Sequence, residues 1–232
     1  MLDAFRIIWL GLTDFWDDFV LMLTFNLAWS LAALLPTLPF FVLGTISWTA
    51  VALTGLLALP LPIVSGALCY VANQVSRGLA PDLGMFASGV RRYWRKSLLV
   101  ALINLLVVAT VLVNLRFYGD VLQAGWTSII VVMWLVASLY WLLAQIYWFP
   151  MILELENERV VLALRNSLAM VLVAPGFTLL LGLLLAAMAA LFVVTTLPAV
   201  LFLGSVWMLI ANHATRSRRA AIQHKPYPPQ RS

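Results

Sequence analysis

Six long stretches of this chain contain no charged residue, and they constrain its fold more than any other feature. They cover residues 19–35, 39–59, 97–115, 127–149, 176–197 and 199–213. A helix that crosses the hydrocarbon core of a bilayer, about 30 Å thick, needs about 20 apolar residues. Such a helix satisfies its own backbone hydrogen bonds, as the bilayer interior requires. The runs therefore predict an all-α polytopic transmembrane helical bundle of about six spans (five to six).

The composition supports a single membrane domain. Only 10% of the residues are charged and 64% are hydrophobic, whereas soluble domains carry about 25% charged residues. Residues 1–215 are expected to form one transmembrane helical domain. Residues 216–232 are basic and proline-rich, so they are expected to form a disordered cytoplasmic tail.

Two segments between the apolar runs have the pattern of helices lying in the membrane plane. Residues 3–18 repeat aromatic and aliphatic residues every three to four positions, and residues 83–97 do the same. Amphipathic helices of this kind rest at the headgroup level, here on the cytoplasmic side. Residues 63–75 are too short to cross a bilayer alone. They continue the second span after a bend or form a short helix beneath it, and the sequence leaves both possibilities open.

The second amphipathic segment carries a cluster of cations within six positions: Arg91, Arg92, Arg95 and Lys96. On a helical wheel they occupy a different arc from Tyr93 and Trp94. Nucleic-acid binding needs cations and aromatic rings on one exposed face, so it is not expected. The favoured interpretation is contact with anionic lipid headgroups, each cation contributing about 1 kcal/mol. Contact with a protein partner is the alternative.

Charge asymmetry predicts the orientation. Thirteen of the fourteen Lys and Arg residues fall on the N-terminal side of the six spans, and only Arg116 falls on the other side. Because Lys and Arg in short segments prefer the cytoplasm, both termini are expected there. The chain is thus expected to be a multi-pass membrane protein with both termini in the cytoplasm.

The sequence contains none of the usual catalytic, metal-binding or phosphate-binding motifs. No catalytic residue, cofactor or metal is therefore expected, and the protein is not expected to be an enzyme. His213 falls at a span end, where an interfacial residue is favoured over a ligand. The carboxylates flank the spans, as at Asp14, Glu154 and Glu158. They are expected to form a solvated polar rim.

Four amide side chains fall in the inner half of four spans: Asn26, Asn104, Gln145 and Asn212. The favoured interpretation is interhelical hydrogen bonding, which contributes about 0.6 kcal/mol on average. The alternative is that the four converge on a pocket for a small ligand, as in a small-solute transporter or channel. No Asp, Glu, Lys or Arg lies within the spans, which weakens a proton- or ion-coupled mechanism.

Several ordered segments resemble the YesL-like family of bacterial integral membrane proteins, whose function is unknown. The segments are "NLAWSLAALLP" (26–36), "PIVSGALCYVANQVSRG" (62–78), "FASGVRRYWRKSLLVALINLL" (86–106), "VNLRFYG" (113–119) and "FPMILELENERVVLALRNSL" (149–168). The resemblance departs at 36–76, where an additional apolar run intervenes. It implies a location in the bacterial cytoplasmic membrane and a non-enzymatic accessory role near carbohydrate uptake, with a transporter permease as the partner. It supplies no catalytic residues.

Overall fold

The computed structural model describes residues 2–44, 47–121, 126–224 and 227, and every regular element in this part of the chain is helical. The elements are α1 (Leu2–Asp17), α2 (Phe19–Leu34), η1 (Leu35–Thr37), α3 (Leu38–Leu43), α4 (Trp48–Ala58), α5 (Pro60–Val75), α6 (Leu83–Arg116), η2 (Phe117–Val121), α7 (Thr127–Glu154), α8 (Val160–Val173), α9 (Pro175–Thr195) and α10 (Leu197–Ile222). Six helical stretches are long and apolar enough to cross a membrane. The expected all-α bundle of about six spans is confirmed.

The helices do not coincide with the predicted limits of the first two spans. The first helical stretch runs on from Phe19 to Leu43, through Pro36 and Pro39. Each proline occupies the first turn of a new helical segment, where its missing N–H costs no hydrogen bond. The chain turns at Gly44, whose φ of 62° is easily adopted by glycine. The second stretch is Trp48–Val75, so residues 63–75 continue that span, which was one of the two possibilities.

The basic segment at 83–97 is not a separate in-plane helix. It is the first part of α6, which continues without a break from Leu83 to Arg116. The helix begins after Asp82, whose side chain accepts a hydrogen bond from the Met85 N–H at 2.6 Å. An uninterrupted helix places the four cations along the extension of the predicted third span of 97–115.

The C-terminal half departs from the predicted limits in similar ways. Pro150 lies inside α7, which extends to Glu154 and does not end at the proline. A separate helix, α8, follows from Val160 to Val173. The last span extends to Ile222, so residues 216–222 of the expected tail are helical. Residues 225–226 and 228–232 of that tail lie outside the described residues.

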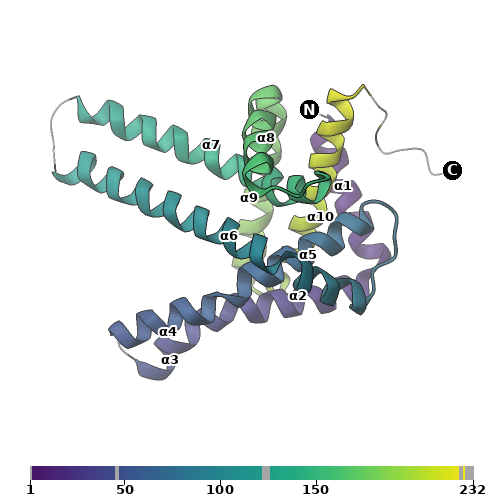
Figure 1. The fold of residues 1–232 in the computed structure, drawn as a ribbon, viewed down its shortest axis with the longest axis horizontal. Coiled ribbons are helices and arrows are strands. Elements are labelled where there is room, and N and C mark those ends of the chain that lie inside the picture. Colours follow the sequence, from purple (N-terminus) through teal and green to yellow (C-terminus); the bar gives the residue numbers. More distant parts are fainter. Residues whose placement is uncertain (1, 45–46, 122–125, 225–226, 228–232) are drawn as a thin grey trace.

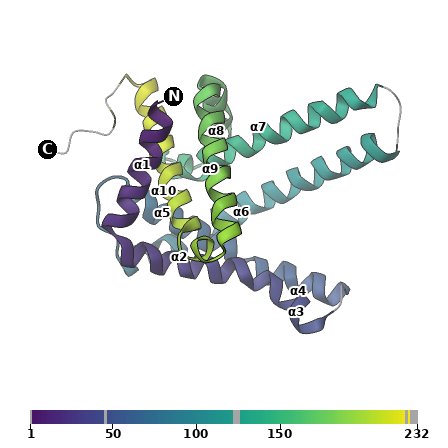
Figure 2. The same cartoon turned by 180° about the vertical axis from the view of Figure 1, so that it is seen from behind.

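The helices do not form a compact cylinder. Figure 1 and Figure 2 show α6 and α7 leaving the rest of the molecule as a long two-helix arm. The hairpin of α2 to α4 forms a second arm that diverges from the first, while α1, α8, α9 and α10 lie together. The largest buried side chains include Trp148, Tyr147, Phe25 and Leu209. The core therefore lies where the two arms meet the other helices.

Candidate functional site

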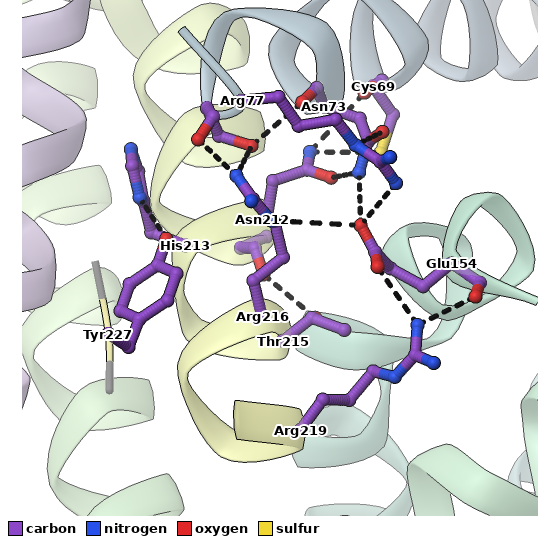
Figure 3. Close-up of polar contacts among 12 residues, drawn as sticks. Cys69, Asn73, Arg77, Glu154, Asn212, His213, Thr215, Arg216, Arg219 and Tyr227 are labelled. Atoms are coloured by element: carbon purple, nitrogen blue, oxygen red, sulfur yellow. Dashed lines mark hydrogen bonds and ion pairs between the residues drawn. The ribbon is translucent and has the colours of Figure 1, made fainter. Parts of the chain in front are cut away.

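The α5, α7 and α10 helices end around one carboxylate, that of Glu154 (Figure 3). Its Oε1 accepts hydrogen bonds from Asn73 Nδ2 at 3.0 Å and Arg77 Nη2 at 2.8 Å. Its Oε2 accepts from Arg219 Nη1 at 2.9 Å, and the same guanidinium donates to the Glu154 backbone carbonyl at 2.6 Å. Arg216 Nε lies 3.9 Å from Oε1. We call these residues the Glu154 network.

The Glu154 network carries an excess of positive charge. Three guanidiniums surround a single carboxylate, whose side chain is only 13% exposed. The expectation that Glu154 belongs to a solvated rim is therefore wrong. Charge-assisted hydrogen bonds are about twice as strong as neutral ones, so this carboxylate fastens the ends of three helices together. The network is a structural junction with residual cationic character.

A second carboxylate, Glu158, lies in the turn after α7 and joins it to α6. It accepts hydrogen bonds from Arg92 Nη2 at 2.6 Å, from Tyr93 Oη at 2.8 Å and from Lys96 Nζ. Burial raises the pKa of Glu158, but the hydrogen bonds and positive charges outweigh it and hold the pKa below its ordinary value. Glu158 also has a φ of 47°, an uncommon conformation for a residue with a side chain. The three hydrogen bonds hold this turn in place.

His213 is buried and makes two hydrogen bonds. Its Nε2 lies 2.7 Å from Asp14 Oδ2, and its Nδ1 lies 2.6 Å from Tyr227 Oη. Asp14 belongs to α1, so the imidazole joins the first helix to the last and to the segment that follows it. Asp14 is only 11% exposed, and its expected place in a solvated rim is wrong. His213 lies at the junction of these segments rather than on a free surface.

The four amides do not converge on a single pocket. Asn26 bonds to the Val200 carbonyl at 2.6 Å and to the Ser205 N–H at 2.8 Å, which joins α2 to α10. Asn212 accepts from Asn73 Nδ2 at 3.1 Å and thereby extends the Glu154 network. Both are completely buried. In these two cases the side chains act as interhelical hydrogen-bonding groups, which was the favoured interpretation.

The other two amides meet each other. Asn104 Nδ2 donates to Gln145 Oε1 at 3.2 Å, and Trp141 Nε1 donates to Asn104 Oδ1 at 2.9 Å. Both amides line a cavity of about 550 Å³ between α5, α6, α7 and α10, which we call the lateral cavity. Its volume falls in the range of small-molecule sites. Asn104 and Gln145 are therefore the two predicted ligand-binding residues that share a cavity.

The lining of the lateral cavity is mostly apolar, with Trp148, Phe149 and Trp207 as its aromatic members. Ser97 also lines it, and the Ser97 hydroxyl is buried without a hydrogen-bond partner. No charged side chain lies among the described lining residues. The cavity is suited to a neutral molecule with a hydrogen-bonding group.

The four cations expected at lipid headgroups fall into two pairs. Arg92 and Lys96 are paired with Glu158, as described above, whereas Arg91 and Arg95 are exposed and form no ion pair with any described residue. The Arg95 guanidinium lies 5.0 Å from the centre of the Trp94 ring. The expected separation of cations from aromatic rings is therefore incomplete. Headgroup contact stays a prediction for all four.

Within the described residues, no group of three or more His, Cys, Asp or Glu side chains is arranged to hold a metal ion. Comparison of the chain with protein-family models, with curated proteins and with solved structures finds no match. The resemblance to the YesL-like family stays a prediction.

Proposed function

We propose that this chain is a non-catalytic accessory protein of the bacterial cytoplasmic membrane, which binds a transmembrane partner along the α6–α7 arm. The observation that carries the proposal is the exposure of α6. No residue in the most apolar 18-residue segment of Leu83–Gly119 is buried. In the most apolar 18-residue segment of Leu197–Ile222, half of the residues are buried. An arm that packs so little against its own molecule offers a long apolar face to another membrane helix.

The resemblance to the YesL-like family favours a permease of a carbohydrate uptake system as this partner. Such a role needs neither a nucleophile nor a metal. Without a hydrophobic driving force between helices in lipid, association depends on close packing and occasional hydrogen bonds. Leu105 and Leu112 on α6 are both more than half exposed and are therefore available for close packing.

Site-specific photocrosslinking in intact cells tests this proposal. A photoreactive residue at Leu105 or Leu112 should form an adduct with one membrane protein, identified as a permease by mass spectrometry. The matched controls are Leu183 and Leu191 on α9, which are similarly exposed and should label lipid alone. Lipid adducts alone at the α6 positions, or the same protein adducts at the α9 positions, would refute the proposed docking face.

Both termini are proposed to lie in the cytoplasm, because the basic residues gather on one side of the spans. Topology reporters fused at residues 85, 155 and 220 should report the cytoplasm, and one at residue 122 should report the exterior. A cytoplasmic signal at residue 122 would contradict six spans with this orientation.

The lateral cavity favours a second candidate function, a small-solute transporter or channel. Asn104 and Gln145 provide its amides, while Asn26 and Asn212 hold helices together elsewhere. Solute flux into liposomes that contain only this protein, lost in Asn104→Leu, would support transport. An absence of flux together with a crosslinked permease favours the accessory role.

A further inference from the structure

A groove runs between α8 and the last turns of α10, apart from the lateral cavity. It consists of two adjoining pockets of about 240 and 220 Å³, which share Met170, Val173 and Ile222. Arg219 lines one pocket and Arg218 lines the other. The α8–α10 groove thus has an apolar floor with a guanidinium in each of its two parts.

Arg218 is the less satisfied of the two guanidiniums. Its Nε is buried without a hydrogen-bond partner, and its guanidinium carbon lies 4.0 Å from the centre of the Phe177 ring. Its ion pair with Asp3 spans 3.5 Å, and the Asp3 side chain is 65% exposed. A buried donor without an acceptor is costly. Arg218 is therefore suited to receive a further anionic acceptor.

The position of this guanidinium points to the source of the anion. Phe177 is the third residue of the candidate span Pro175–Thr195, so Arg218 lies at the boundary of the hydrocarbon core. Ala174, which precedes α9, lines the same pocket, and the start of α9 has no side-chain cap. The unpaired N–H groups and dipole of a helix start add to the attraction for an anion. At this boundary the abundant anion is a lipid phosphate.

The floor of the groove suits the other part of a lipid. Met170 is buried, while Val173 and Ile222 are more than half exposed. An acyl chain can therefore lie along the groove with its phosphate at Arg218. The positive charge of Arg218 is also less neutralised than that of Arg219, which is already bonded to the Glu154 carboxylate.

We propose that the α8–α10 groove is a specific site for one anionic phospholipid, with its phosphate on Arg218 and an acyl chain over Met170, Val173 and Ile222. This site is distinct from the cations at the start of α6. Arg92 and Lys96 there are neutralised by Glu158, and no pocket described above includes Arg91. The site stands independently of the proposed permease partner.

Native mass spectrometry of the full-length protein, released from detergent with added lipid, tests the proposal. Phosphatidylglycerol should bind as a single tight equivalent and phosphatidylcholine at least about tenfold more weakly. Arg218→Gln should weaken phosphatidylglycerol binding about tenfold, because it removes a charge-assisted hydrogen bond of about 1.4 kcal/mol or more. Arg116→Gln makes the same charge change at an exposed position on the opposite side of the spans and should alter binding less than twofold.

Two further measurements keep the proposal open to refutation. Val173→Trp fills the exposed floor and leaves both arginines in the sequence, so it should weaken lipid binding even if Arg218→Gln fails to fold. Inorganic phosphate and glycerol 3-phosphate, at the same concentrations, should not compete with the lipid. Competition by either would make this a soluble-phosphate site. Equal losses in Arg116→Gln and Arg218→Gln, or unchanged binding in Val173→Trp, would overturn the groove as the lipid site.

Discussion

Replacing Glu154 by glutamine tests whether its carboxylate fastens three helix ends together. The substitution keeps the shape of the side chain and removes its charge, which leaves three guanidiniums beside a neutral amide. Breaking a buried ion pair by removing one partner costs about 3–5 kcal/mol. Here the Arg77 side chain is 41% exposed, and solvent screening reduces the contribution of such pairs. We therefore expect a loss of about 2 kcal/mol in the free energy of unfolding.

Denaturant titration of the purified protein in a mild detergent measures this loss. Glu156→Gln is the matched control, since Glu156 is exposed and forms no ion pair with the described residues. That control should change the free energy of unfolding by less than about 0.5 kcal/mol.

A double-mutant cycle separates the ion pair from other effects of the substitution. Arg219→Gln in the Glu154→Gln background removes a guanidinium that has already lost its carboxylate partner. The pair of changes should thus cost about 1 kcal/mol less than the sum of the single changes. Additive effects, or a Glu154→Gln protein as stable as Glu156→Gln, would refute the network as a structural junction.

Three more predictions concern other contacts. The pKa of Glu158 is held below its ordinary value of 4.5, so its ionised form stabilises the fold at neutral pH. That contribution should disappear as the pH falls below about 4.5, and Glu158→Gln should flatten this part of a stability–pH profile. Asn104→Leu breaks its bonds to two neighbouring side chains and should cost about 1 kcal/mol in denaturant titration. Asn114→Leu, which loses only a bond within its own helix, should cost less. Gly66→Ala places a Cβ 2.0 Å from a serine hydroxyl oxygen of α6 and should lower the stability by about 1–3 kcal/mol. Gly55→Ala meets nothing within 4 Å and should be neutral or stabilising in the same assay.

The helical class and the number of spans could be predicted because they depend on local properties. An apolar run without charges has few alternatives to a membrane helix, whatever its neighbours are. The start of α6 was equally local, since Asp82 needs only the next turn of backbone to cap it. Features of this kind can be predicted because they depend on residues that are close together in the sequence.

The ends of the helices could not be predicted from the prolines, because a proline indicates a missing hydrogen-bond donor and not the end of a helix. Pro36 and Pro39 begin new helical segments that continue the same stretch. Pro150 lies inside α7, one turn before its end. In a membrane protein the freed carbonyl is re-satisfied by neighbouring groups or small backbone adjustments. Whether a proline ends a span therefore depends on the packing around it.

The site depends on crossings between distant helices, which is why only part of it could be predicted. The position of each amide along its span predicted that all four lie in the inner half of the bundle. This position does not specify which helices contact one another. Asn26 bonds to α10, 174 positions away, while Asn104 meets Gln145 across the α6–α7 arm. A solute pathway built from all four amides is therefore incompatible with this arrangement. Any ligand in the lateral cavity has two amides and the hydroxyl of Ser97 available to it, which favours one neutral hydrogen-bonding group over a heavily hydroxylated solute.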